Sequence, residues 1–320
     1  TLDRSSAASD VYKRQLEPGS DTSHSRRMTR QPGRSVTSGP WSGYPDAMLA
    51  VECFSLVVLA LFVAVAQDRK ACLRDALLIS LGALLGEDTC IRAYGFYFYS
   101  NEWHVFFDKV PLVVLLIWPA VVLSATKIAR AVSPRASAAR LGATVCAIVV
   151  FDAALIEPIA VHADLWHWTR QGIFHVPIVG ILGWGFYAGC IVFLLERTRG
   201  AARVFIPAAS ALATHGLLLV SYWGLFRYVL RYDLPFHVCV GLVVPASLWY
   251  VTKVVRAKAT LSLGDLAARG AATSLFVYLL AKRPDAELIL YALTFTLPHL
   301  VLVVASLRAR AVRPVEVVST

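Results

Sequence analysis

The chain has 320 residues, of which 57% are hydrophobic and only 16% are charged, and its formal net charge is +10. Soluble proteins carry about 25% charged residues, so this composition excludes a soluble enzyme, a disulfide-stapled secreted domain and a nucleic-acid-binding protein. The hydrophobic residues gather in blocks such as 48–66, which reach the ~20 residues that a helix needs to cross the apolar core of a bilayer. We therefore predict an all-α fold, a polytopic transmembrane helix bundle.

The N-terminal stretch differs from the rest of the chain. Residues 1–47 are polar, are rich in Ser, Arg and Gly, and show no apolar periodicity. They lack the apolar core of a signal peptide, and the opening letters TLDRSSAASDVYKRQ resemble translated adapter sequence. Met48 opens the first apolar block. We expect residues 1–47 to be a disordered or non-native extension and residues 48–320 to form a single transmembrane domain.

Apolar runs predict the spans in chain order. Seven are clear, at 48–66, 76–98, 105–126, 141–162, 173–195, 204–226 and 234–252, and the run 286–307 is an eighth candidate. The segment 261–281 contains Asp265 and Arg269, so it is either a poor span or an amphipathic helix at the membrane interface. The sequence therefore predicts about seven to nine spans.

The cations between the spans indicate the orientation. The loops after spans one, three, five and seven carry most of them, and the loops after spans two, four and six carry few. The cation-rich set comprises Arg69, Lys70, Arg74, Lys127, Arg130, Arg135, Arg140, Arg197, Arg199, Arg203, Lys253, Arg256 and Lys258. Because cytoplasmic loops are enriched in Lys and Arg, we expect a multi-pass protein of the inner (plasma) membrane with its N-terminus outside.

Two segments of the chain share one pattern, which predicts an internal pseudo-repeat. Each has an acidic residue in a span, then a pair of aromatic residues, then Val-Pro, and then a tryptophan seven residues after the proline. The first unit contains Glu87, Tyr97, Tyr99, Val110-Pro111 and Trp118. The second unit contains Glu157, Trp166, Trp168, Val176-Pro177 and Trp184. Duplicated membrane folds commonly place their site between the repeats, and Pro is common at a helix start.

Three acidic residues within the spans are candidates for function. They are Glu87 in the second span, and Asp152 and Glu157 in the fourth. A carboxyl group at bilayer depth is usually functional, paired or protonated, because an isolated charge is costly there. Asp88 has a structural explanation, since Arg92 stands four residues later and can pair with it on one helix face.

Histidines and cysteines give no signal for a metal. His104, His162, His167, His175 and His237 fall near the ends of spans, where polar aromatic residues are ordinary. The six cysteines are scattered singly without a CxxC pair, and the chain has no DxxxD pair that would hold a prenyl diphosphate through magnesium. We predict no metal site and no cofactor.

These residues resemble an integral-membrane carotenoid biosynthesis family that includes the hydratases of the bacterioruberin and myxoxanthophyll pathways. The resemblance rests on Glu87, Gly95, Tyr97, Tyr99, Val110-Pro111 and Trp118, and on Glu157-Pro158, Trp168, Gly172, Val176-Pro177 and Gly183-Trp184. It covers residues 80–200 or so. The chain departs from the family's pattern with Lys109 and His175 before Val-Pro, with Gly180 where Asn is usual, and with Glu157 in place of Asp.

The resemblance implies hydration of a terminal C=C bond of an acyclic carotenoid. A carboxylic acid protonates the alkene, aromatic faces stabilise the tertiary carbocation by up to ~2 kcal/mol each, and water captures it. Burial favours the neutral form of a carboxyl group, as such an acid requires. In this hypothesis Glu87 or Glu157 is the acid and Asp152 orients water. The substrate-binding residues would be Tyr97, Tyr99, Trp118, Trp166, Trp168 and Trp184.

Two other functions fit the same residues. A membrane lycopene cyclase begins with the same protonation but quenches the cation on an internal alkene, so it is an isomerase. A carotenoid- or lipid-binding protein would use the acids only as polar contacts between helices. In each case the expected partners are a hydrophobic polyene and the lipid bilayer, with no nucleic acid, and association with other enzymes of the carotenoid pathway is a further expectation.

Overall fold

Ten α-helices make up most of the computed structural model, which describes residues 45–169, 172–226 and 236–311. The N-terminal extension lies outside these residues except for its last three, which begin the first helix. Contacts divide the chain at Gly39, and everything described below belongs to the second unit, Pro40–Thr320. The helices are α2 (Pro45–Ala64), α3 (Arg69–Tyr94), α4 (Leu112–Val132), α5 (Ala138–His162), α6 (Ile178–Arg197), α7 (Ile206–Leu219), α8 (Phe236–Ala257), α9 (Leu263–Lys282), α10 (Ala286–Leu293) and α11 (Thr296–Ala311). Two short helices, η1 (Gly200–Phe205) and η2 (Val220–Phe226), flank α7.

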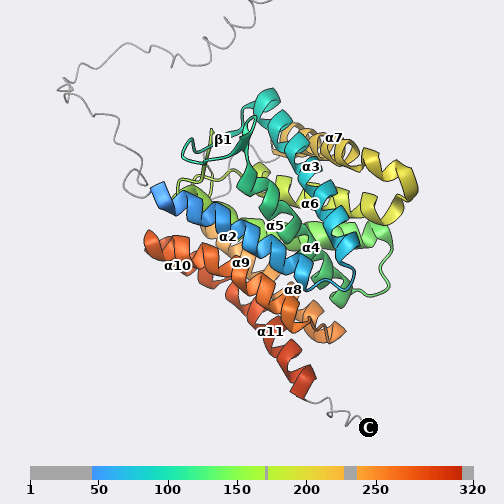
Figure 1. The fold of residues 1–320 in the computed structure, drawn as a ribbon. Coiled ribbons are helices and arrows are strands. Elements are labelled where there is room, and N and C mark those ends of the chain that lie inside the picture. Colours follow the sequence, from blue (N-terminus) through green and yellow to red (C-terminus); the bar gives the residue numbers. More distant parts are fainter. Residues whose placement is uncertain (1–44, 170–171, 227–235, 312–320) are drawn as a thin grey trace, which may run out of the picture. The chain divides into compact units, whose positions relative to one another are not determined.

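The described helices confirm the all-α, polytopic transmembrane class. Six of them are long and apolar enough to cross a membrane, and the bent pair α10–α11 would make a seventh, which is the lower end of the predicted range. The ambiguous segment 261–281 forms α9, one of these six candidate spans. Helix α2 is a shorter apolar helix by the same test. Figure 1 shows α3 to α6 running side by side, with α7 on one side of them and α8, α9 and α11 on the other.

Helix ends fall where the local sequence stops or starts a helix. The predicted span 76–98 ends early, at Tyr94, because Gly95 adopts a left-handed conformation with φ of 59° and turns the chain out of the helix. The predicted span 105–126 begins late, at Leu112, directly after Pro111. Helix α6 likewise begins directly after Pro177. The expectation that a proline restarts a helix in each unit is confirmed.

Short strands between the helices join the two units of the pseudo-repeat. Strand β1 (Tyr97–Tyr99) of the first unit pairs antiparallel with β4 (Trp166–Trp168) of the second, and Phe98 lies opposite His167 at its centre. Strands β2 (Phe106–Phe107) and β3 (Val110–Pro111) form a separate hairpin. Strands at equivalent positions of the two predicted units therefore lie side by side.

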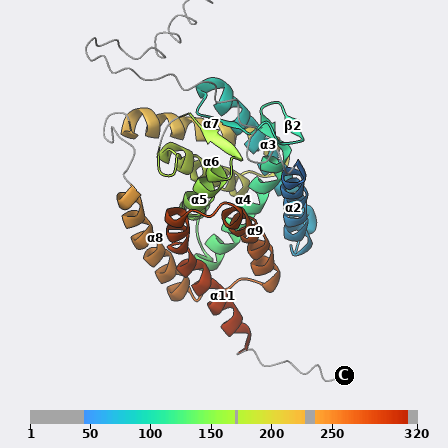
Figure 2. The same cartoon turned by 90° about the vertical axis from the view of Figure 1, so that its left-hand side faces the viewer.

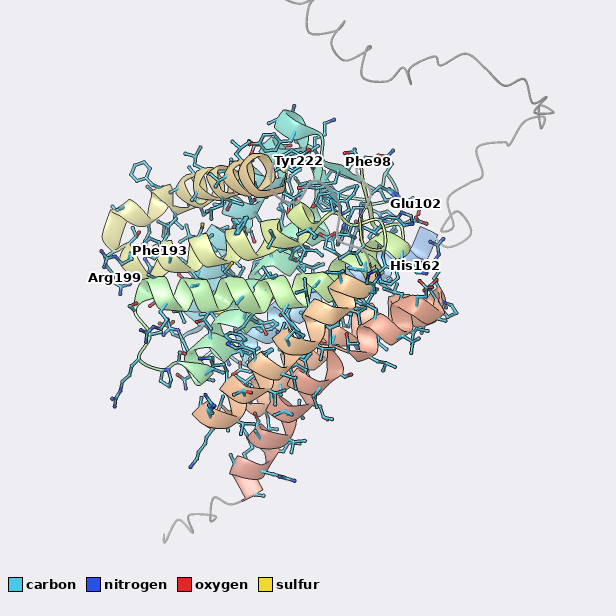
Figure 3. The ribbon with its side chains drawn as sticks, turned by 180° about the vertical axis from the view of Figure 1, so that it is seen from behind. Phe98, Glu102, His162, Phe193, Arg199 and Tyr222 are labelled. Atoms are coloured by element: carbon cyan, nitrogen blue, oxygen red, sulfur yellow. The ribbon has the colours of Figure 1, made fainter. Side chains whose placement is uncertain are left out.

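The strands lie at one end of the bundle. Figure 3 shows Phe98, Glu102 and His162 at that end, and Phe193 and Arg199 at the opposite end. Helices α5 and α6 approach each other closely, because a Cβ atom on Gly142 would lie only 2.8 Å from the carbonyl oxygen of Gly189. Small residues permit such contacts between membrane helices. Glu157 and Trp184, which share a hydrogen bond, lie on this same pair of helices.

Candidate active site

The carboxyl group of Glu157 accepts three hydrogen bonds, all from tryptophans of its own repeat unit. On α5, Glu157 is 2% exposed. Its Oε2 atom accepts from the indole N–H groups of Trp166, at 2.8 Å, and Trp168, at 2.9 Å. Its Oε1 atom accepts from Trp184 of α6 at 2.5 Å. The aromatic pair and the tryptophan after Val-Pro therefore converge on the acid that precedes them.

The carboxyl group of Glu87 is held in the same way in the first unit. Its Oε2 atom accepts hydrogen bonds from the hydroxyls of Tyr97 and Tyr99, the latter at 3.0 Å. Its Oε1 atom accepts from the indole N–H of Trp118 on α4, at 3.0 Å. Burial raises the pKa of Tyr97 and of Tyr99 well above the usual value, and the neighbouring Glu87 raises both further. Both hydroxyls therefore stay neutral.

Aromatic rings from the two units stack against one another between the acids. The ring centroids of Trp118 and Trp184 are 4.5 Å apart, and those of Tyr97 and Trp168 are 4.8 Å apart. Glu87 and Glu157 line one apolar cavity with these rings, and the empty space in it, including its open part, is about 1050 Å³. Ligand sites in proteins are mostly lined by hydrophobic and aromatic side chains with a few polar groups, and this cavity has such a lining.

The two carboxyl groups differ in what their partners can do. An indole N–H only donates, whereas a tyrosine hydroxyl both donates and accepts. A proton on Glu87 therefore has an acceptor in Tyr97 or Tyr99, while all three protein partners of Glu157 are donors. The contacts of Glu157 suit an ionised carboxylate, and those of Glu87 suit either form.

Asp152 lies apart from these two acids. Its carboxylate accepts from Nη2 of Arg269 on α9, at 2.6 and 2.8 Å, and it lines a second cavity. The structure therefore does not bring Asp152 to the cavity of Glu87 and Glu157, where it was expected to orient water. Arg269 is one of the two charged residues that made the segment 261–281 ambiguous. Its guanidinium compensates the charge of the buried Asp152 carboxylate.

Asp88 and His104 each lie beside an oppositely charged or polar partner, as in ordinary ion pairs. Asp88 accepts a hydrogen bond from Nε of Arg92 at 2.8 Å, which confirms the pairing expected from their spacing. Nδ1 of His104 lies 3.3 Å from a carboxylate oxygen of Glu52. Among residues 45–169, 172–226 and 236–311, no group of three or more His, Cys, Asp or Glu side chains is placed to hold a metal ion.

The sequence reasoning missed several residues around the site. Leu275 and Phe276 of α9 line the cavity from outside the repeat, and no motif marks them. Gly180 was noted only as a departure from the family's pattern, yet the ring of Trp168 occupies the space that a side chain there would take. The one feature in the sequence that could have marked Gly180 as a site residue is that glycine has no side chain and so leaves room for a neighbouring ring.

We expect Gly180→Ala to destabilise the protein by about 1–3 kcal/mol, the usual cost of overpacking. The added methyl group would meet the six-membered ring of Trp168 and push it from Glu157. Gly216→Ala is the matched control, because a Cβ atom there meets nothing within 4 Å. Alanine in a helix should stabilise that position by about 0.5–1 kcal/mol. Unfolding of both variants in detergent measures the difference, and equal stabilities would contradict the packing described.

The fold and this site define a polytopic helical membrane protein with two buried carboxyl groups facing one apolar cavity. A family described as carotenoid biosynthesis protein matches residues 47–256, which include both repeat units and every residue that holds the two acids. The chain belongs to this carotenoid biosynthesis protein family. No curated protein and no solved structure matches the chain.

Proposed function

We propose that the protein is a carotenoid hydratase, which adds water across a terminal C=C bond of an acyclic carotenoid. One observation carries the proposal: two buried carboxyl groups with different hydrogen-bond partners face a single cavity walled by aromatic rings. Paired titratable groups in different environments are the usual arrangement for acid and base roles. The family supplies the class of substrate.

Glu87 is the proton donor in this proposal. Its O–H bond breaks as a C–H bond forms at the less substituted alkene carbon, which leaves a tertiary carbocation and a Glu87 carboxylate. Tyr97, Tyr99 and Trp118 donate hydrogen bonds to that carboxylate, so the charge is stabilised where it forms. The rings of Trp118, Trp168 and Trp184 present electron-rich faces to the cation.

Glu157 is the base and the counter-charge. Three indole N–H groups donate to its carboxylate, which in its ionised form attracts the cation and accepts a proton from the water molecule as that oxygen bonds to the cationic carbon. The product is a tertiary alcohol. The proton then returns from Glu157 to Glu87 by way of water, which restores both groups for the next turnover.

The distribution of cations indicates how the protein is oriented in the membrane. The cation-rich loops share the end of the bundle opposite the strands, where Nη1 of Arg203 lies 3.1 Å from Asp75 and Nη2 of Arg130 lies 2.5 Å from Glu196. We place that end in the cytoplasm by the enrichment of Lys and Arg. The strands and the two acids then lie toward the outer face of the inner membrane, with the N-terminus of α2 also outside.

Expression of the wild-type chain in a lycopene-accumulating bacterial strain tests this function. We expect pigment whose mass has risen by one water, or by two if both ends react, and a tertiary hydroxyl group in the product. Pigment of unchanged mass with a cyclised end group would instead identify a cyclase, which omits the capture by water. Unaltered lycopene beside abundant, folded protein would contradict both enzymatic functions and favour a binding role.

A further inference from the structure

A second cavity lies next to the one that holds the two acids. It is enclosed by α2, α4, α5, α9 and the region of α10 and α11, and its empty space, including its open part, is about 870 Å³. Its walls are mostly apolar, with Val58, Ala120, Leu155, Ala272 and Phe295 among them. Figure 2 shows α9 beside α4 and α2, on the far side of the bundle from α7.

The two cavities share a wall. Ile117 of α4, Ile156 of α5, and Leu275 and Phe276 of α9 line both of them. On α5, Ile156 directly precedes Glu157 in the first cavity, and Leu155 lines the second cavity. Leu275 and Phe276 are only half-buried. The two cavities therefore adjoin each other at these four apolar side chains.

The charged groups at the second cavity do not call for a charged ligand. Arg269 donates through Nη2 to both oxygens of Asp152 and through Nη1 to the hydroxyl of Ser124, at 2.9 Å. Nε2 of His299 lies 3.8 Å from the same carboxylate. Because these charges compensate one another, an ionic ligand would gain no unpaired partner, and the remaining lining favours an apolar occupant.

We propose that the second cavity holds the polyene chain of a carotenoid whose end group lies between Glu87 and Glu157. This inference rests on the proposed function for its substrate class. A linear polyene is far longer than its reacting end, and the second cavity offers its chain an adjoining apolar space, bordered by the same side chains of Ile117, Ile156, Leu275 and Phe276. The second cavity then makes the protein selective for chain length, since a shorter carotenoid needs less of it.

Ala272→Phe tests the assignment by filling the second cavity. Ala272 lines that cavity and not the first. Ala267→Phe is the matched control on the same helix, because Ala267 is exposed and lines neither cavity. Val121→Phe fills the second cavity from α4 and serves if the first variant does not accumulate. Each chain is produced in one strain that makes lycopene, with forty carbons, and in another that makes an acyclic thirty-carbon carotenoid.

Two readouts are taken: the hydrated fraction of the pigment, and the pigment retained per purified protein by absorbance. For the filled variants we expect retention and hydration of lycopene to fall at least about tenfold, a loss of about 1.4 kcal/mol of binding free energy, because the added ring takes space that the polyene chain needs. Both values for the thirty-carbon compound should stay near those of the wild type, and Ala267→Phe should match the wild type throughout.

The outcomes separate the inference from the function on which it rests. Folded filled variants that handle both carotenoids like the wild type, or that lose both equally, would overturn the second-cavity assignment. If the wild type retains lycopene but forms no alcohol, the hydratase function fails, and the retention values alone decide the assignment. Failure of the wild type to retain or convert either carotenoid would overturn both.

Discussion

Glu87→Gln should abolish hydration while the protein remains folded. A carboxamide matches the size of the carboxyl group but has no proton to give to an alkene. General acid catalysis contributes about a hundredfold to ten-thousandfold to a rate, and we expect a loss in this range or greater. The amide can still satisfy its neighbours, since its oxygen accepts from Trp118 and its NH₂ group donates to Tyr97 and Tyr99.

Glu157→Gln is the informative comparison, because the same substitution meets different neighbours. Trp166, Trp168 and Trp184 all donate to Glu157, so the NH₂ group of glutamine would face at least one indole N–H. A buried donor left without an acceptor costs about 1–3 kcal/mol. We therefore expect this variant to lose stability as well as activity, whereas Glu87→Gln loses activity alone.

Pigment mass from a lycopene-producing host measures activity, and thermal unfolding in detergent measures stability. Glu102→Gln provides a control, since Glu102 lines neither cavity. Hydrated product at wild-type yield from the Glu87→Gln chain would refute its role as the acid. If Glu157→Gln abolished hydration and Glu87→Gln did not, Glu157 would be the proton donor and Glu87 the base.

Arg269→Met should cause the largest loss of stability among the variants considered. The side chain of Arg269 is 16% exposed and that of Asp152 is 9% exposed, and the pair bridges α9 and α5. Removing one partner of a buried ion pair leaves an uncompensated charge and typically costs about 3–5 kcal/mol. The hydroxyl of Ser124 also loses its hydrogen bond from Nη1 of Arg269.

Two further variants show whether the charge is the cause. Arg130→Met removes an ion pair with Glu196 whose side chains are 58% and 32% exposed, and such surface pairs contribute only about 0–1 kcal/mol. The double variant Arg269→Met/Asp152→Leu removes both buried charges and should recover much of the loss. Unfolding in detergent, with membrane yield alongside, gives the comparison. A double variant less stable than Arg269→Met would show that packing dominates over charge.

The pattern of apolar blocks was sufficient to predict the class of fold and the approximate ranges of the helices. That pattern is local, because a helix in a bilayer satisfies its backbone within itself and needs only enough consecutive apolar residues. The repeated order of acid, aromatic pair, Val-Pro and tryptophan also identified the two units. Helix ends were less well predicted, since the turn at Gly95 ends α3 at Tyr94 and leaves Tyr97, which the predicted span 76–98 included, in a strand.

Tertiary structure decided which acids belong together. In the sequence Asp152 is closer to Glu157 than Glu87 is, yet Glu87 and Glu157 face one cavity and Asp152 faces another. Five residues along a helix turn a side chain by about 140° from its starting direction, so neighbours on α5 point to different partners. The indoles of Trp166 and Trp168 reach Glu157 from the strand that follows α5, whereas the guanidinium of Arg269 reaches Asp152 from α9, a distant part of the chain.

The sequence by itself therefore determined the bundle, its repeat and the residues that had to be explained, because hydrophobic length and motif spacing are properties of the chain alone. Tertiary structure determined that two tyrosines and a tryptophan hold Glu87 while three tryptophans hold Glu157, that α9 supplies the partner of Asp152, and that two cavities share a wall. The partner of Asp152 and the shared wall come from segments far apart in the chain, and the contacts of the two acids need the chain to fold back from the strands onto the helices.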